Sequence, residues 1–246
     1  MDKTYACSDL HGLYPLWEQI KDYCDETDTI YFLGDAIDRG PDGIKILLEM
    51  LYDPRIIFLK GNHESFLEES GEELLEDHYP FSIRLWEQNG GWKSIDDFSK
   101  LDKRVGKWLF KKIKALPLTA EYVNKKGQKI LLSHAGYHPM CEPKEREYLW
   151  DREHVYLPWS DSEEYKETYV IHGHTPVQYL IFKAGFQRVK PELDDEGSYD
   201  PLVYADGHKI DIDVGSFFSG KAVLFDLDEL KVAARFYDEE QKRMVW

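Results

Sequence analysis

Residues 29–40 read TIYFLGDAIDRG, a short apolar run that ends at Gly34 and is followed by Asp35 and Asp38. A short apolar run bounded by glycine is typical of a buried β-strand. In open α/β sheets the functional site lies beyond the carboxyl ends of the strands. The stretch therefore predicts a buried strand that delivers Asp35 to a crevice at one edge of a sheet.

Four more segments repeat this arrangement, each with an apolar run followed by residues that can hold a metal. They are residues 4–12 (TYACSDLHG), 55–64 (RIIFLKGNHE), 130–136 (ILLSHAG) and 169–176 (YVIHGHTP). In chain order, the first three of the five segments are residues 4–12, 29–40 and 55–64. They are spaced roughly thirty residues apart, the length of a strand, a crossover helix and the next strand. Parallel βαβ units place their strand ends on one side, so Asp9, Asp35 and Asn62 should be neighbours.

The segments between the runs carry helical periodicity. Residues 13–24 and 44–51 each place their apolar side chains on one face. Residues 65–128 are expected to be largely helical and to frame one wall of the cleft, while residues 209–237 should supply closing strands. The sequence therefore predicts an α/β fold with a mixed sheet, and we expect one catalytic domain, 1–246.

The candidate ligands are carboxylates, imidazoles and one amide oxygen, with no thiolate among them. Such a mixed oxygen and nitrogen set suits Mn, Fe or Zn. One carboxylate can bridge two cations about 3.5–4 Å apart, as in two-metal phosphoryl transfer. Asp35 is the expected bridge because it lies on the central member of the three repeats.

In this order, the motifs resemble those of the calcineurin-like metallophosphoesterases. Within them, the chain is most similar to the phosphoprotein phosphatase family, in the branch of the lambda phage protein phosphatase and its bacterial relatives. Residues 149–152 (LWDR) and 212–215 (IDVG) resemble two further segments of that branch, and the resemblance runs from about Tyr5 to Phe225. It implies a β-sandwich of two mixed sheets flanked by helices.

The resemblance also implies a role for each motif residue. Asp9 and His11 would bind the first metal, Asp35 both metals, and Asn62, His134 and His174 the second. His63 would protonate the leaving oxygen, with Asp38 holding it in orientation, and Arg39 and Arg152 would bind the phosphate. The implied cofactors are two divalent ions, with Mn²⁺ favoured and Fe or Zn as alternatives. The implied nucleophile is a metal-bridging water that attacks phosphorus in line, without a phosphoenzyme.

Structural alternatives exist for single residues. A Gly-Asp or Gly-Asn pair often serves only as a turn, His63 or His134 could be a core histidine, and Arg152 could lie in a surface loop. Histidines in the same turns after the predicted strands favour a metal site, because a turn by itself does not require histidine. His172 should lie behind the site or pack within its strand. Four histidines match no motif and are expected at the surface: His78, His138, His154 and His208.

Three functions remain open. The leading one is a phosphomonoester hydrolase, most simply a serine/threonine protein phosphatase with possible dual specificity, acting on phosphorylated proteins or small phosphomonoesters. The second is a dinucleoside polyphosphate hydrolase that cleaves substrates such as diadenosine tetraphosphate. The third, a binding module without activity, is disfavoured because every motif residue is present. The net charge of −16 argues against a nucleic-acid partner.

The remaining features concern location and one extra stretch. No apolar run has the length needed to span a bilayer, Met1–Thr4 leads directly into the first strand without a signal peptide, and the three cysteines suggest reduced thiols. We therefore expect a cytoplasmic protein with no membrane partner; the sequence carries no signal for its oligomeric state. Residues 190–208 are an extra stretch relative to the family pattern. We expect them to form either an acidic surface loop or an acidic face that selects substrates.

Overall fold

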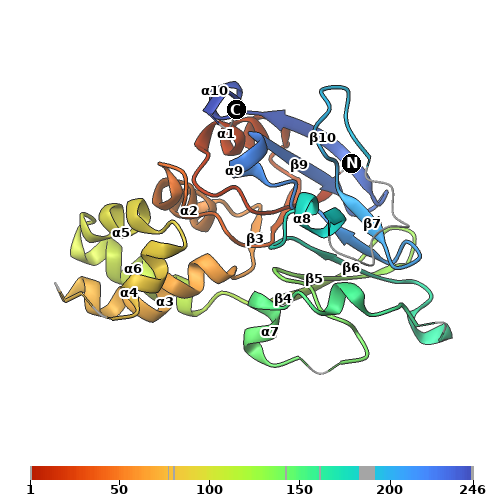
Figure 1. Ribbon diagram of the computed structural model, residues 1–246, viewed down its shortest axis with the longest axis horizontal. Helices are drawn as coiled ribbons and strands as arrows, with labels where there is room; N and C mark the ends of the chain where they lie inside the picture. The colour runs from red at the N-terminus through yellow and green to blue at the C-terminus, as the bar shows by residue number, and fades with distance from the viewer. Residues whose placement is uncertain are drawn as a thin grey trace.

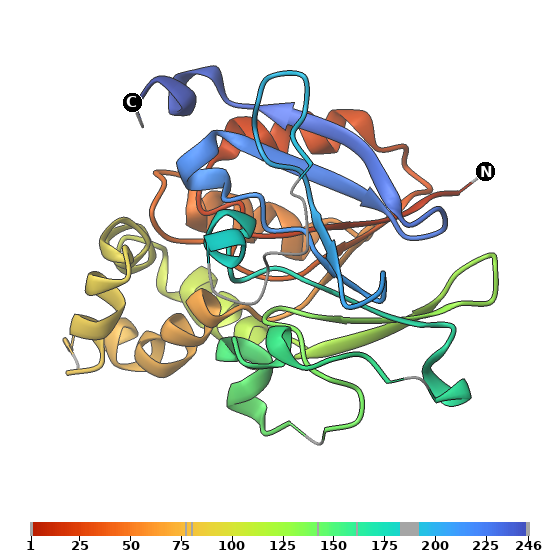
Figure 2. The same ribbon diagram turned by 45° about the vertical axis from the view of Figure 1, so that its right-hand side comes forward.

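Two β-sheets form the centre of the molecule. The computed structural model describes all residues except 1, 77, 80, 142, 161, 183–191 and 245–246. In this part of the chain the strands form two five-stranded sheets, in the orders β10-β9-β1-β2-β3 and β4-β5-β6-β8-β7. The sheets lie one above the other, with helices around them (Figures 1 and 2). The expected α/β fold of two mixed sheets flanked by helices is confirmed.

The first sheet contains the three predicted repeats. Strands β1 (Thr4–Cys7), β2 (Thr29–Phe32) and β3 (Ile56–Phe58) are parallel neighbours. Helices α1 (Tyr14–Tyr23) and α2 (Gly43–Tyr52) make the crossovers between them. The three strands therefore end at the same edge. Two antiparallel strands complete the sheet, β9 (Lys221–Asp226) and β10 (Lys231–Tyr237).

The second sheet has three parallel strands at its centre. These are β5 (Lys129–Ser133), β6 (Thr168–His172) and β8 (Lys209–Asp211), with β4 (Thr119–Val123) and β7 (Leu202–Tyr204) antiparallel at the edges. The expectation that 65–128 is largely helical is wrong at its end. The chain leaves the helical region at Lys114, and a turn at Gly127 pairs β4 with β5 as a hairpin.

Four helices form a side region next to the sheets (Figure 1). They are α3 (Asn62–Leu75), α4 (Ile83–Gln88), α5 (Trp92–Ser99) and α6 (Lys103–Lys114). Asp102 caps α6 by accepting a hydrogen bond from the backbone N–H of Arg104 at 2.8 Å. Phe66, Trp86 and Leu109 join these helices to the core that also covers α1 and α2.

The hydrophobic core has two main parts. Between the sheets, Ala6, Leu33 and Phe225 of the first sheet side share one cluster with Leu132 and Ile171 of the second. On the other side of the first sheet, buried side chains of α1 and α2 share a second cluster with those of β1 and β2. Full burial of one large apolar side chain stabilises the fold by about 1.5–3 kcal/mol. Because each cluster buries many such side chains, the clusters hold the two sheets together and thereby fix how the strand ends meet.

Shorter elements complete the chain, and none of the helices in the described residues is long and apolar enough to cross a membrane. Their bounds are α7 (Glu145–Trp150), η1 (His154–Tyr156), η2 (Glu163–Tyr165), α8 (Val177–Phe182), α9 (Ser216–Ser219) and α10 (Glu239–Met244).

The extra stretch predicted at 190–208 includes β7; residues 190 and 191 lie outside the described residues. Two of its carboxylates turn towards the first sheet. Asp194 pairs with Lys221 at 2.7 Å, and Asp200 pairs with Lys221 at 2.6 Å and with Arg235. These ion pairs neutralise part of the acidic charge within the fold, so those two carboxylates are not free to select a substrate.

Candidate metal centre and phosphate site

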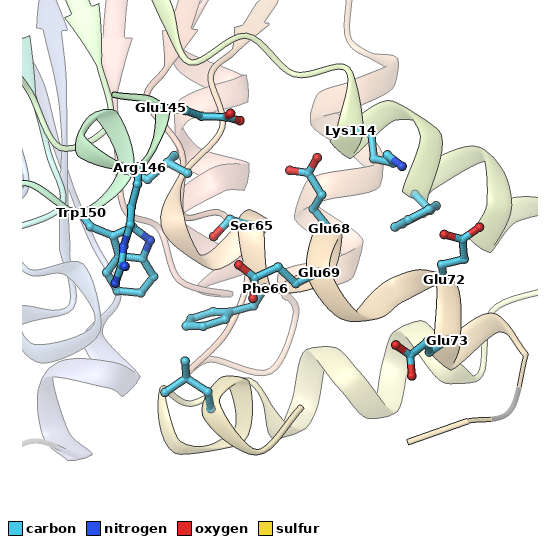
Figure 3. A pocket seen from close by; sticks show the side chains of 13 residues that line it. Ser65, Phe66, Glu68, Glu69, Glu72, Glu73, Lys114, Glu145, Arg146 and Trp150 are labelled. Carbon is cyan, nitrogen blue, oxygen red and sulfur yellow. The ribbon is translucent and has the colours of Figure 1, made fainter. Parts of the chain in front are cut away.

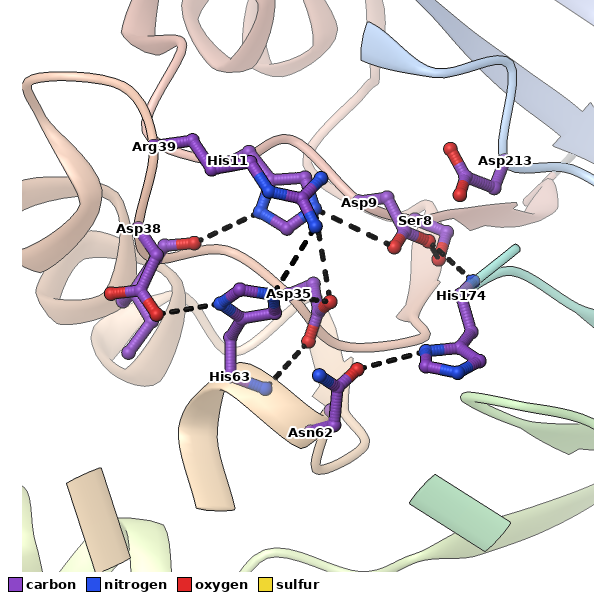
Figure 4. Close-up of polar contacts among 12 residues, drawn as sticks. Ser8, Asp9, His11, Asp35, Asp38, Arg39, Asn62, His63, His174 and Asp213 are labelled. Carbon is purple, nitrogen blue, oxygen red and sulfur yellow. Dashed lines mark hydrogen bonds and ion pairs between the residues drawn. The ribbon is translucent and has the colours of Figure 1, made fainter. Parts of the chain in front are cut away.

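The predicted site residues gather where the ends of both sheets meet. The turns after β1, β2 and β3 come from the first sheet, and those after β5 and β6 come from the second. Figure 4 shows the side chains from both sets pointing into one space. The structure brings together all ten predicted site residues: Asp9, His11, Asp35, Asp38, Arg39, Asn62, His63, His134, Arg152 and His174.

Glycine allows the turns of neighbouring strands to touch. A Cβ atom at Gly12 would lie 2.7 Å from the carbonyl carbon of Gly40, and one at Gly34 would lie 2.5 Å from the Cα of Gly61. The backbone N–H of Gly12 donates to the carbonyl of Ala36 at 2.8 Å. Any larger residue at these positions would push the turns apart and separate the polar side chains that follow the strands.

Several site residues have a left-handed backbone. Among the described residues, positive φ angles outside glycine are concentrated in the site: Asp9 (54°), His11 (45°), Asp35 (61°), Asp38 (72°), Arg39 (65°) and His174 (70°). This conformation costs an L-residue roughly 1–2 kcal/mol. Such strain persists only where the surroundings hold it, and it clusters at functional sites. Sequence spacing alone gives no sign of this feature.

Two clusters of possible metal ligands share Asp35. One contains His11, Asp35 and His63, and the other contains Asp35, His134 and His174, with the ligand atoms of each within 4.8 Å of one another. The Oδ2 of Asp35 lies 3.7 Å from His11 Nε2 and 3.5 Å from His134 Nε2. Asp35 is thus the carboxylate common to both clusters, the place that the sequence predicted for a bridging ligand.

Asp9 joins the first cluster from the end of β1. Its Oδ1 lies 3.9 Å from His11 Nε2 and is buried without a hydrogen-bond partner among the described residues. Its Oδ2 accepts hydrogen bonds from the Ser8 hydroxyl and from the backbone N–H of His174, the latter at 3.1 Å. The carboxylate is therefore held by both sheets and leaves one oxygen directed at the cluster.

The second cluster fits a cation because two acceptor atoms, His134 Nε2 and Asn62 Oδ1, face each other there. His134 donates from Nδ1 to the carbonyl of Leu33 at 2.8 Å, so Nε2 of the neutral ring carries a lone pair. This Nε2 lies 2.7 Å from Asn62 Oδ1, which is itself an acceptor, and His174 Nδ1 lies 2.9 Å from the same oxygen. Acceptors this close repel one another unless a cation lies between them. Metal-binding histidines commonly donate their other N–H to a backbone carbonyl.

His11 repeats this pattern in the first cluster. Its Nδ1 lies 3.1 Å from the carbonyl of Ile37, which leaves Nε2 facing Asp35. Burial lowers the pKa of His11 and His174 well below the usual range and also lowers the pKa of His134. All three rings are therefore neutral at neutral pH, the form that binds metal. Burial raises the pKa of Asp35 well above its usual range, a penalty that nearby cations would offset.

His63 is held between a carboxylate and a guanidinium. Its Nδ1 lies 2.6 Å from Asp38 Oδ2, and its Nε2 lies 3.3 Å from Nη2 of Arg39 (Figure 4). The side region supports Asp38, because Trp86 donates its indole N–H to the same oxygen at 2.7 Å and the Ser94 hydroxyl accepts from the Asp38 backbone N–H at 2.9 Å. Sequence reasoning missed Trp86 and Ser94, since they match no motif and lie far along the chain.

Glu64 is a further residue whose function the sequence did not indicate. Its buried carboxylate accepts three backbone N–H groups, from Asp35 at 2.8 Å and from Ala36 and Gly61 at 3.0 Å. It therefore ties the turn after β2 to the start of α3. The signal that could have revealed it was present, since Glu64 is the last residue of the GNHE motif.

Both predicted phosphate-binding arginines line one cavity of about 360 Å³. His174, Thr175, Tyr179 and Phe218 line it with them. Arg152 donates from Nε to the Thr175 hydroxyl at 3.1 Å, and the Arg39 guanidinium lies 5.9 Å from the centre of the Phe218 ring. The cavity therefore places two guanidinium groups beside the candidate metal ligand His174, an arrangement that suits an anion such as phosphate.

A larger cavity of about 740 Å³ lies close to His63 and His174. Phe66 and Trp150 belong to its wall, and their rings lie 5.8 Å from His63 and 6.0 Å from His174, respectively. Figure 3 shows the glutamates of α3 along it, with Lys114, Glu145 and Arg146 opposite. The carboxylates outnumber the cations in this wall: Glu68, Glu69, Glu72, Glu73 and Glu145.

Two of the four histidines outside the motifs differ from the expectation, whereas His78 is exposed as expected and His208 is half-buried. His154 and His138 are buried, with exposed fractions of 2% and 6%, so their expected surface positions are wrong. His154 packs edge to face on His172 with ring centres 5.0 Å apart. His172 is the last residue of β6, and its Nε2 lies 2.7 Å from the hydroxyl of Tyr204. It packs behind the metal ligands, as predicted.

Residues 3–210 match the family profile of the calcineurin-like phosphoesterases. The match covers most of the chain, so the protein belongs to this family and the resemblance found in its motifs is confirmed. Members of the family are hydrolases that use divalent metals, and the two ligand clusters around Asp35 are the candidate metal sites here.

Relatives of this chain include proteins named as protein phosphatases and proteins named as dinucleoside tetraphosphatases. A Caenorhabditis elegans protein provisionally named a serine/threonine-protein phosphatase is 26% identical over 207 residues, 76% of this chain and 49% of the relative. A symmetrical bis(5'-nucleosyl)-tetraphosphatase of Buchnera aphidicola is 25% identical over 154 residues, 56% of this chain and 46% of the relative. The chain thus spans about half the length of these curated relatives.

A solved structure illustrates the shared fold. It is a protein provisionally described as a diadenosine tetraphosphatase, and it superposes on this chain with a TM-score of 0.58 at 14% identity. The superposition covers 96% of this chain and 93% of that chain. At this identity the likeness describes the fold alone.

Proposed function

We propose that the protein is a binuclear-metal-dependent phosphomonoester hydrolase, and specifically a serine/threonine protein phosphatase that can also accept phosphotyrosine. One observation carries this proposal. Two clusters of histidine and carboxylate side chains share Asp35, and His63, a member of the first cluster, pairs with the buried Asp38. This arrangement would supply ligands for two metals and a proton donor, the groups that metal-dependent ester hydrolysis uses.

The proposed ligands follow from the two clusters. Asp9, His11 and Asp35 would hold the first cation, and Asp35, Asn62, His134 and His174 the second. We propose Mn²⁺ for both because hard oxygen ligands accompany imidazole in each set. When bound, the two cations supply Lewis acidity that makes water a stronger nucleophile and neutralises charge on the phosphate.

Arg39 and Arg152 are the proposed phosphate-binding residues. A guanidinium offers two parallel N–H groups, which match two oxygens of a phosphate. The contact of Arg152 Nε with Thr175 leaves its terminal nitrogens for the substrate. In the proposed reaction, water oxygen bonds to phosphorus as the bond from phosphorus to the ester oxygen breaks, and the two arginines hold the charged oxygens throughout.

His63 is the proposed general acid. Its Nδ1 lies 2.6 Å from Asp38 Oδ2, a contact that fixes the orientation of the ring. Arg39 Nη2 can only donate, so the Nε2 that it contacts carries a lone pair in this arrangement. We propose that Nε2 takes up a proton once Arg39 turns to the phosphate, and that this proton passes to the ester oxygen as the alcohol leaves. Arg39 lies on the same side of the ring as Nε2, so the phosphate that it binds would bring the ester oxygen to the proton donor.

The alternative is hydrolysis of dinucleoside polyphosphates, because relatives of both names match the chain at similar identity. Charge favours the protein substrate. Five glutamates line the large cavity near His63, against one lysine and one arginine, and the whole chain has a net charge of −16. A tetraphosphate would bring additional negative charge to this wall, where like charges repel.

A side-by-side assay tests the proposal. The Mn²⁺-loaded protein would be given p-nitrophenyl phosphate, a panel of phosphoserine, phosphothreonine and phosphotyrosine peptides, and diadenosine tetraphosphate. We expect hydrolysis of the monoesters, with larger kcat/KM for phosphopeptides than for diadenosine tetraphosphate. Higher kcat/KM for diadenosine tetraphosphate would establish the alternative, and failure to hydrolyse any of the phosphate esters would refute the proposed function.

A further inference from the structure

We propose that Lys209 is a positioning residue for phosphate binding, because its buried side chain holds the short segment that carries Arg152. Lys209 itself would not touch the substrate. This inference rests on the proposed function, since it acts through the proposed role of Arg152 in binding phosphate.

The side chain of Lys209 is buried at the start of β8, with an exposed fraction of 0%. Its Nζ donates to the backbone carbonyl of His154 at 2.5 Å and to that of Leu157 at 3.4 Å. These two carbonyls lie at the beginning of η1 and just beyond its end. Lysine is among the residues least often fully buried, and burial of its charge is costly unless the ammonium is hydrogen-bonded. The second sheet therefore holds this segment through the ammonium group of Lys209.

The segment is also fixed from its other sides. Asp151 accepts the backbone N–H of Glu153 at 2.7 Å and that of His154 at 3.2 Å, which forms a tight turn around Arg152. The His154 ring packs on His172, and a Cβ atom at Gly136 would lie 2.6 Å from His154 Nε2. The backbone on the C-terminal side of Arg152 is thus enclosed between the turn after β5 and the second sheet.

Arg152 is held at its other end by Thr175, whose hydroxyl accepts from Nε at 3.1 Å. Thr175 directly follows the metal-ligand candidate His174. The guanidinium therefore has one anchor near the metals, while its backbone is anchored through Lys209. Groups that bind a reacting phosphate must be placed to within about 0.5 Å. Loss of the Lys209 anchor would let the backbone move and would misalign the bidentate contact.

Lys221 provides a matched comparison. It is the other lysine among the fully buried side chains of the described residues, also with an exposed fraction of 0%. Its Nζ pairs with Asp194 at 2.7 Å and with Asp200 at 2.6 Å, in the extra stretch. Lys221 and Lys209 therefore share burial and charge, but only Lys209 contacts the segment that carries Arg152.

A double-mutant cycle tests the proposal in the Mn²⁺-loaded, full-length protein. We would measure kcat and KM for a phosphopeptide, and the inhibition constant of orthophosphate, for Lys209→Met, Arg152→Ala, the double variant and Lys221→Met. We expect Lys209→Met to raise the KM and the orthophosphate inhibition constant about tenfold, with a smaller change in kcat. In the Arg152→Ala background, Lys209→Met should cause no further change. Lys221→Met should leave both constants unchanged per mole of folded protein.

Asp151→Ala is a second variant in case Lys209→Met fails to fold. Removal of a negative charge beside Arg152 would, by electrostatics alone, strengthen phosphate binding, whereas loss of the turn that positions Arg152 would weaken it. We expect weaker binding. Equal effects of Lys209→Met in the wild-type and Arg152→Ala backgrounds, or tighter phosphate binding by Asp151→Ala, would overturn the inference. If Arg152→Ala itself leaves KM and the inhibition constant unchanged, the proposed role of Arg152 fails first.

Discussion

Asp38 and Trp86 meet through one hydrogen bond of 2.7 Å, from the indole N–H to Oδ2 of the carboxylate that holds His63. Asp38 comes from the turn after β2, while Trp86 comes from α4 in the side region. The side region is therefore more than a wall of the cleft, because it fixes the orientation of the proposed proton donor.

Trp86→Phe should lower kcat on phosphoserine peptides about tenfold, because Asp38 and hence His63 lose a fixed position. A hydrogen bond to a charged group contributes roughly 1.5–3 kcal/mol, so stability should fall as well. The matched control is Trp17→Phe. Trp17 is equally buried and donates to Glu49 at 3.1 Å, away from the site. A loss of kcat in Trp17→Phe as large as in Trp86→Phe would indicate a general packing effect.

His63→Asn should lower the rate on an alkyl phosphate such as phosphoserine by about 10²–10⁴, the usual contribution of a general acid. On p-nitrophenyl phosphate the loss should be much smaller, because p-nitrophenolate leaves without needing a proton. Steady-state kinetics on both substrates, with bound Mn²⁺ measured in parallel, separate this role from metal binding. Equal losses on both substrates would mean that His63 acts otherwise, for example as a ligand.

Glu64→Gln should destabilise the protein and weaken metal binding together. The carboxylate accepts three backbone N–H groups, and an amide offers only one oxygen, so buried donors lose their partner at a cost of about 1–3 kcal/mol. Denaturant unfolding and a Mn²⁺ binding isotherm measure the two effects. Glu72→Gln, at an exposed position on the same helix, should change neither. Wild-type Mn²⁺ affinity in Glu64→Gln would disprove the proposed link between this carboxylate and the Asp35 turn.

Much of the site follows from the sequence because its ligands lie directly after strands. Asp9, Asp35 and Asn62 are tied to consecutive parallel strands with similar spacing, so the topology of the βαβ unit alone makes them neighbours. His134 and His174 follow the same rule in the second sheet. Their meeting with the first set required the family resemblance, because spacing within one sheet does not fix how two sheets pack.

The supporting residues could not be predicted in the same way. Trp86 and Ser94 reach Asp38 from helices whose apolar periodicity describes only their packing. The buried position of His154 depends on Lys209, which is 55 residues away in the chain. The helical periodicity within residues 65–128 predicts a largely helical stretch and does not reveal β4. These contacts arise from tertiary packing between distant segments, which local periodicity does not report.

Stability should depend on pH through Lys209. Burial lowers the pKa of Lys209 from 10.5 to about 8. Between these values the unfolded chain retains a proton that the folded protein has released, so the free energy of unfolding rises with pH across this window. Lys209→Met lacks this contribution. Denaturant unfolding from pH 7 to 10 should show the wild type gaining stability relative to the variant above pH 8, and a constant difference would contradict the assignment.

The proposed mechanism requires two metal sites that share Asp35, both occupied for phosphoester hydrolysis. The most direct measurement is a Mn²⁺ titration of the chelator-treated protein, with bound Mn²⁺ and the rate on p-nitrophenyl phosphate recorded together for wild type, Asp35→Asn and Asn62→Ala. We predict that wild type regains activity as it binds two Mn²⁺ per chain. Asp35→Asn should lose more metal and more activity than Asn62→Ala, because it removes the ligand common to both clusters. Wild-type Mn²⁺ content and rate in Asp35→Asn would contradict the account.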